Sequence, residues 1–91
     1  MEDTIRALYE VVRDRKAHPQ EGSYTCYLFD QGLDKILKKC GEECSEVIIA
    51  AKNKNQEETI GEISDLLYHL TVLMVNEGIE LEAVEAVLAE R

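Results

Sequence analysis

The 91-residue sequence contains a single proline, Pro19, and it has no apolar run long enough to cross a membrane. Stretches such as residues 47–51 fall far short of the roughly 20 residues that span a bilayer, and residues 1–7 are acidic instead of forming an apolar leader. Repeats, linkers and low-complexity tracts are also missing. We therefore predict one domain over residues 1–91 that is soluble, cytoplasmic and without a membrane partner.

Cysteine is scarce as well. The three residues Cys26, Cys40 and Cys44 are odd in number and show none of the spacings typical of zinc knuckles. Cys40 and Cys44 fall four residues apart on an apolar stripe of a predicted helix. We expect all three to be core thiols in a reducing cytosol.

Positive charge is in short supply, since ten Lys and Arg face nineteen Asp and Glu and leave a net charge of −9. A surface this acidic repels phosphate backbones, which argues against a nucleic-acid partner. A smaller phosphate ester would need divalent cations to neutralise the repulsion. The acidity is therefore a first indication of a metal site.

Alternating strand patterns are absent, and apolar residues instead recur at three- and four-residue steps. The steps predict helices over residues 4–17, 32–53, 57–76 and 81–90, with Gly78 as a stop signal. Residues 19–31 are expected to form an irregular connector with room for a helical turn at 24–29. The fold class is all-α, a bundle of four to five helices with two long central ones. The stripes of the two long helices are Leu33, Ile36, Leu37, Cys40, Cys44, Val47, Ile48 and Ala51, and Ile60, Ile63, Leu66, Leu67, Leu70, Leu73 and Met74.

A lone chain of this size is marginal, because it buries only about 60–65% of the surface that its unfolded form exposes. The apolar stripes are also wider than one partner helix covers. We expect a homodimer or a higher homo-oligomer whose interface supplies part of the core.

Each long helix carries an acidic pair three residues apart: Glu43 and Glu46 on the first, Glu62 and Asp65 on the second. Members of such a pair lie about 60° apart on the helix surface, one turn above the other. Both pairs fall on the same flank of their apolar stripes, while Glu42 points further out. If the helices pack as an antiparallel hairpin, the four carboxylates can converge beside the core.

Four converging carboxylates repel one another, since like charges 4 Å apart cost on the order of 4 kcal/mol at an effective dielectric near 20. A hard cation removes that cost, and all-oxygen ligands favour Mg²⁺, or Mn²⁺, over zinc. The alternative is a solvated acidic face, because nineteen acids in 91 residues produce such pairs by chance.

Several neighbours of the acidic pairs are candidates for binding a substrate. Lys35, Lys38 and Lys39 precede the first pair, and they are either salt-bridge partners of the acids or ligands of a polyphosphate. Tyr68 and His69 follow Asp65 by three and four residues. His69 is a candidate for hydrogen bonding to substrate or to a carboxylate, and a structural histidine is the alternative.

Glu42-Glu43-x-x-Glu46 followed by Glu62-x-x-Asp65 resembles the signature of the MazG-like, all-α nucleoside triphosphate pyrophosphohydrolases. Residues 23–25, 32–39, 41–43, 49–52 and 65–70 together resemble the phosphoribosyl-ATP pyrophosphatase family within that group, and the resemblance spans nearly the whole chain. Departures from the family pattern occur at positions where small or aliphatic residues are expected, and they concern packing alone: Cys26, Cys40, Cys44 and Ser64.

The resemblance implies Mg²⁺-dependent hydrolysis of phosphoribosyl-ATP to phosphoribosyl-AMP and pyrophosphate, in the stand-alone form of an enzyme that is elsewhere fused to the cyclohydrolase acting next. It implies Glu43, Glu46, Glu62 and Asp65 as metal ligands and Glu42 as a candidate for orienting water or binding a further ion. The candidates for the phosphoribosyl or adenosine end are Arg15, Lys16, Ser23, Tyr24 and Thr25.

Two other functions remain open. A house-cleaning MazG-like pyrophosphatase acting on dCTP or dUTP would share the metal site without needing Ser23, Tyr24 and Thr25. A non-catalytic acidic helical interaction module would use the carboxylates only as a solvated face.

Overall fold

The computed structural model describes residues 2–91, with side chains from Thr4 onward. Within that range the chain forms five α-helices and no strand. They are α1 (Glu2–Ala17), α2 (Tyr24–Gln31), α3 (Leu33–Lys52), α4 (Gln56–Asn76) and α5 (Leu81–Ala89). The all-α class and the two long central helices are confirmed, and the four expected helices begin and end within two residues of their predicted bounds.

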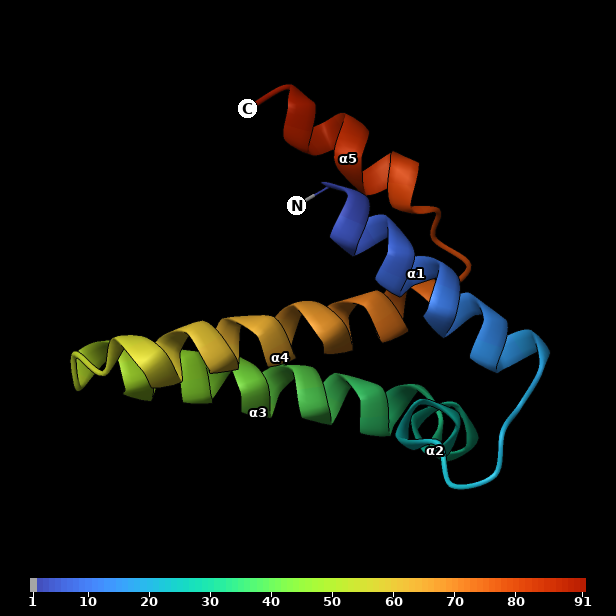
Figure 1. Cartoon of the computed structure of the whole chain (residues 1–91), viewed down its shortest axis with the longest axis horizontal. Coiled ribbons are helices and arrows are strands. Elements are labelled where there is room, and N and C mark those ends of the chain that lie inside the picture. Colours follow the sequence, from blue (N-terminus) through green and yellow to red (C-terminus); the bar gives the residue numbers. More distant parts are fainter. Residues whose placement is uncertain (1) are drawn as a thin grey trace.

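Helices α3 and α4 form a long antiparallel hairpin that carries the rest of the molecule on one end (Figure 1). Helix α2 crosses the hairpin beside the start of α3, and α1 lies across the last turns of α4, with α5 further out. The other end, around the α3–α4 turn, projects as an arm that no further helix covers (Figure 1).

The buried core lies at the supported end of the hairpin. Tyr9 and Val12 of α1 meet Leu28 of α2, Ile36 of α3 and Val72 of α4, and the last four of these are at most 1% exposed. The Tyr9 hydroxyl also donates to the carbonyl oxygen of Ile79 at 2.9 Å. This packing fixes α2 against the first half of α3, where the candidate site begins.

Helix α2 is more regular than the sequence predicted. Instead of one helical turn at residues 24–29, the connector contains a helix of 8 residues. Ser23 caps its first turn, because the Ser23 Oγ accepts a hydrogen bond from the Cys26 amide at 3.2 Å. Gly32, with φ of 92°, ends it and turns the chain directly into α3.

The turn between α3 and α4 relies on a residue in an unusual conformation. Lys54 has φ of 60°, the one positive value for a non-glycine residue in the described chain. Its amide donates to the Ala51 carbonyl, and the Asn55 amide donates to the Ala50 carbonyl, which closes the end of α3. The Asn55 side chain then caps α4 through the Glu58 amide at 3.0 Å. At the far end of α4, Gly78 provides the predicted stop with φ of 70°.

Within this chain the apolar stripes of α3 and α4 are buried along only part of their length. Ile48 and Ile60 are each 62% exposed and lie on the projecting arm, where α3 and α4 have only each other as partners. The other stripe residues that stay exposed are Leu33, Leu37, Cys44, Ala51, Ile63 and Leu67.

The three cysteines also differ in burial, according to their distance from the core. Cys26 is buried and Cys40 is partly buried, as expected for core thiols, but Cys44 is exposed because it lies where the arm leaves the core. All three are free thiols. Within residues 2–91 no helix is both long and apolar enough to cross a membrane.

Candidate active site

Three acidic side chains of the predicted set converge where α3 and α4 face each other. Glu43 of α3 and Glu62 and Asp65 of α4 each offer one carboxylate oxygen, and these three oxygens lie within 4.8 Å of one another. The fourth, Glu46, is not among these three but lies near enough to Glu43 and Glu62 to shift the pKa of both. The structure thus brings together three of the four side chains that the sequence predicted as metal ligands, with Glu46 beside them.

Crowding shifts the acidities of these groups in opposite directions. The neighbouring Glu46, followed by burial, raises the pKa of Glu62 to about 7. The pKa of Glu43 is raised for the same two reasons, and that of Glu46 is lowered because Glu43 and Glu62 share their protons with it. The metal-free cluster therefore holds protons that isolated carboxylates would lose at neutral pH.

The buried oxygens of this cluster fit a divalent cation. The Oε2 atoms of Glu43 and Glu62 are buried and have no hydrogen-bond partner. Glu43 as a whole is only 7% exposed. A buried carboxylate oxygen without a donor is costly, and a hard cation with oxygen ligands satisfies it.

Lys39 and Glu42 border the cluster on α3. The Lys39 Nζ lies 3.2 Å from Glu42 Oε1 and 4.0 Å from Glu43 Oε1. Glu42 is exposed, as its helical phase predicted, and is not one of the three residues whose oxygens converge. Lys39 is thus the nearest cation to the acidic cluster among the described residues. Its ion pair with Glu42 agrees with the first of the two roles considered for the lysines, that of a salt-bridge partner.

His69 links the cluster to α2. Its Nδ1 lies 2.7 Å from the carbonyl oxygen of Asp65, which can only accept, so Nδ1 carries the proton. Nε2 is then the acceptor for the Tyr24 hydroxyl at 3.0 Å. Burial raises the pKa of Tyr24, which keeps that hydroxyl protonated. The chain of contacts ties the Tyr24 ring to the backbone of a predicted metal ligand.

Ser23 and Thr25 have structural partners on either side of Tyr24. Ser23 caps α2, and the Thr25 hydroxyl is hydrogen-bonded to the Tyr68 hydroxyl of α4. The Tyr24 and Tyr68 rings lie nearly parallel, with centroids 6.2 Å apart. The Ser-Tyr-Thr segment therefore fixes α2 on α4 beside the carboxylates, and its predicted contact with substrate stays a prediction.

Tyr27 is a site candidate that the sequence analysis missed. Its ring lies nearly parallel to that of Tyr24 at a centroid distance of 6.0 Å, and it is 43% exposed. The Lys35 Nζ lies 5.9 Å from the Tyr27 ring centroid. The three-residue spacing of the two tyrosines would have revealed the pair if residues 24–31 had been recognised as a helix.

The basic residues of α1 lie elsewhere. Lys16 places its Nζ 4.9 Å from the Phe29 ring centroid, and Arg15 lies 3.5 Å from Asp14. Neither forms an ion pair or hydrogen bond with the four carboxylates in the described part of the chain. Lys38 is exposed on α3. The structure does not bring these three into the cluster.

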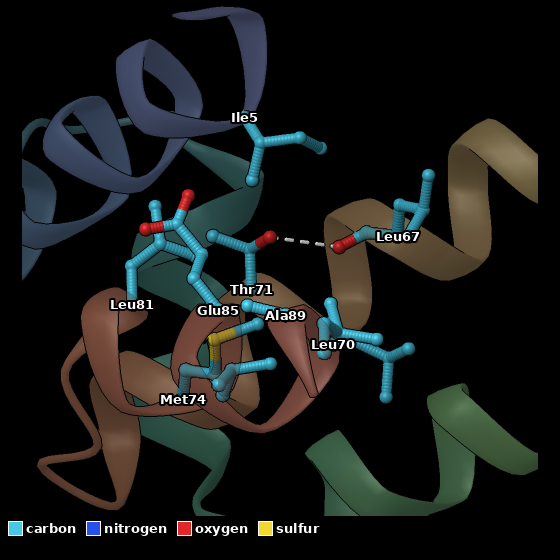
Figure 2. Close-up of a pocket in the computed structure, with 10 residues that line it drawn as sticks. Ile5, Leu67, Leu70, Thr71, Met74, Leu81, Glu85 and Ala89 are labelled. Carbon is cyan, nitrogen blue, oxygen red and sulfur yellow. Dashed lines mark hydrogen bonds between the residues drawn. The ribbon is translucent and has the colours of Figure 1, made fainter. Parts of the chain in front are cut away.

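An apolar hollow of about 500 Å³ lies apart from the acidic cluster, between α1, α4 and α5 (Figure 2). Leu70, Met74 and Leu81 line it, and its Thr71 hydroxyl is used within α4, donating to the Leu67 carbonyl at 2.8 Å. None of the predicted metal ligands lines this hollow. The candidate active site is therefore the acidic cluster of Glu43, Glu62 and Asp65, not this hollow.

Comparison with known proteins adds to this geometry. Residues 5–91 match the sequence profile of the family described as Phosphoribosyl-ATP pyrophosphohydrolase. The chain is 58% identical to a phosphoribosyl-ATP pyrophosphatase of Clostridium botulinum (strain Kyoto / Type A2), over 98% of this chain and 81% of the relative. It is 53% identical to one of Bacillus cytotoxicus, over 100% and 85%. The histidine biosynthesis bifunctional protein HisIE of Thermoanaerobacter pseudethanolicus is 63% identical over 86% of this chain, which spans 36% of that protein.

Proposed function

The chain belongs to the phosphoribosyl-ATP pyrophosphohydrolase family, and on that premise we propose that it hydrolyses 1-(5-phosphoribosyl)-ATP to 1-(5-phosphoribosyl)-AMP and pyrophosphate. This is the second step of L-histidine biosynthesis. The observation in the structure that carries the proposal is the convergence of Glu43, Glu62 and Asp65 within 4.8 Å. Such a cluster suits an enzyme that cuts a phosphoric anhydride between the α and β phosphorus atoms.

The residues that would hold Mg²⁺, or Mn²⁺, are Glu43, Glu46, Glu62 and Asp65. When bound, the metal supplies charge neutralisation for the phosphates and a site for activating water. Support comes from the two buried carboxylate oxygens that lack a donor, those of Glu43 and Glu62. Antiparallel packing of α3 and α4 holds these ligands on two rigid helices, which favours a fixed geometry.

Other side chains act on the phosphates and on the water. Lys39, within 4.0 Å of Glu42 and Glu43, offers an ammonium group to the leaving pyrophosphate by exchanging a carboxylate partner for a phosphate oxygen. Glu42, which is exposed next to Glu43 on α3, orients the entering water and accepts its proton. His69 positions the Asp65 backbone through its Nδ1 proton and fixes Tyr24 through Nε2.

The working form is a homodimer or larger homo-oligomer. Ile48, Ile60 and Leu88 are each 62% exposed in the single chain, and a second copy would cover such apolar side chains. We place the reaction in the cytoplasm, where ATP-derived substrates are made and three free thiols such as these remain reduced.

The direct test is pyrophosphate release by the purified protein from phosphoribosyl-ATP, with and without Mg²⁺, beside dCTP, dUTP and ATP. Metal-dependent release from phosphoribosyl-ATP alone is the expected result. Release from dCTP or dUTP with none from phosphoribosyl-ATP would instead assign the chain to the house-cleaning branch. Release from none of these nucleotides would point to the non-catalytic helical module.

A further inference from the structure

We propose that Tyr27 and Lys35 determine specificity for the part of the substrate beyond the α-phosphate. The Tyr27 ring, beside Tyr24, stacks on the purine, and the Lys35 ammonium pairs with the phosphate of the phosphoribosyl group. This inference rests on the proposed hydrolysis of phosphoribosyl-ATP, because only that substrate carries a second phosphate at the base end.

The two tyrosines form a rigid and accessible aromatic surface. Tyr24 and Tyr27 lie one turn apart on α2, the planes of their rings differ by 24°, and the two residues are 44% and 43% exposed. The Tyr24 hydroxyl is held by His69, so the ring does not need to be ordered when a ligand binds. Stacking of a base on such a ring commonly contributes about tenfold or more to affinity.

Lys35 is the cation beside this surface. Its Nζ lies 5.9 Å from the Tyr27 centroid, and its side chain is partly buried. Lys39, one turn further along α3, is occupied by Glu42, whereas Lys35 has no carboxylate partner among the described side chains. In a chain with a net charge of −9, an ammonium group kept clear of acids is suited to bind an anion.

The spacing along α3 matches the order of groups in the substrate. Lys35, Lys39 and Glu43 follow one another at four-residue steps on one face, and the eight residue steps from Lys35 to Glu43 rise about 12 Å. Phosphates that react at the carboxylates would pass Lys39, and the nucleoside would extend toward Lys35. A hollow of about 540 Å³ beside the two rings is lined by Tyr24 and Tyr27 and by the acidic Glu21 and Asp30. It has room for the uncharged base, and the phosphate would lie outside it at Lys35.

Two ligands without a scissile anhydride separate the roles of the ring and the ammonium group. Calorimetry would compare phosphoribosyl-AMP with AMP on the wild-type protein and on Lys35→Met and Tyr27→Ala. We expect Lys35→Met to lower affinity for phosphoribosyl-AMP about tenfold, or about 1.4 kcal/mol, and to leave AMP binding within twofold. Tyr27→Ala should weaken both ligands, and Tyr27→Phe should rescue both because the ring remains. Lys52→Met, at the exposed end of the same helix, is the matched control.

The inference is overturned if Lys35→Met weakens the two ligands equally or not at all, if Tyr27→Ala leaves both affinities unchanged, or if the wild-type protein binds neither. Circular dichroism of each variant confirms that the helices are intact. Wild-type release of pyrophosphate from phosphoribosyl-ATP separates the two proposals. If the wild-type protein releases pyrophosphate but the variants' affinities for phosphoribosyl-AMP and AMP do not change as expected, the specificity assignment fails and the proposed function stands.

Discussion

Glu43 is the most buried of the four acidic side chains in the site, with 7% exposed and an Oε2 that has no partner. Gln preserves its volume and removes its charge. We predict that Glu43→Gln lowers kcat for phosphoribosyl-ATP at least about a hundredfold, or about 2.7 kcal/mol of transition-state stabilisation. Steady-state pyrophosphate release at saturating Mg²⁺ measures this, with the exposed Glu57→Gln as the control. Turnover within threefold of wild type would remove Glu43 from the ligand set.

Glu62 makes stability depend on pH when no metal is bound. Contact with Glu46, then burial, raises its pKa from 4.5 to about 7, so between these values the folded state binds more protons than the unfolded state. Stability is therefore lost as pH rises through this window. The raised pKa of Glu43 acts in the same direction, and the lowered pKa of Glu46 opposes it. In a chelator, the melting temperature should be lower at pH 8 than at pH 5, and Glu62→Gln should reduce the difference. A melting temperature that is higher at pH 8 would contradict the prediction.

At the level of single residues, helical phase was enough to predict the acidic cluster. When two antiparallel helices pack, i,i+3 pairs on their matching flanks face each other. Glu43, Glu62 and Asp65 converge as expected. The roles of Ser23 and Thr25 could not be predicted in this way, because capping of α2 and the bond to Tyr68 depend on where a short helix docks.

The α3–α4 turn carries a strained position that one substitution can relieve. Lys54 adopts φ of 60°, a conformation that costs an L-residue about 1 kcal/mol or more and costs glycine none. We predict that Lys54→Gly stabilises the protein by about 0.5–1 kcal/mol with unchanged turnover. The same change at Lys38, exposed in the middle of α3, should destabilise it by about 1 kcal/mol. Chemical denaturation measures both, and a loss of stability in Lys54→Gly would show that the turn is not strained.

Among the helices, the long ones were predictable and the short one was not. Helices α3 and α4 present five or more turns of apolar periodicity, whereas α2 has only 8 residues and two buried side chains, Cys26 and Leu28. Its ends are set by Ser23 and Gly32, signals that also occur in loops. Tertiary docking against α3 and α4, not local pattern, decides that this segment is a helix.

The projecting arm and its apolar residues suggest an assembly larger than one chain. Ile48 and Ile60 are each 62% exposed there, a cost that association would remove. We predict twice the monomer mass, or more, by light scattering at micromolar concentration. Ile60→Glu should lower that mass, and Gln20→Glu on the exposed connector should not. A monomeric wild-type protein would contradict the expectation.

For the molecule as a whole, periodicity identified apolar stripes but not what covers them. The stripe of α3 is buried at Ile36, where α1 and α2 complete the core, and exposed at Ile48, where only α4 is near. A sequence pattern predicts that a helix face is apolar. It does not predict whether the surface that packs against this face belongs to the same chain or to a second copy.

Divalent-metal binding tests the central claim most directly, because every role assigned to the site depends on four carboxylates holding a cation. Titration of the purified protein with Mn²⁺, followed by electron paramagnetic resonance, should show saturable uptake in the wild type. The uptake should be lost in Glu43→Gln and retained in Glu57→Gln. Absence of saturable uptake in the wild type, or equal uptake in Glu43→Gln, would show that Glu43, Glu46, Glu62 and Asp65 do not form the metal site.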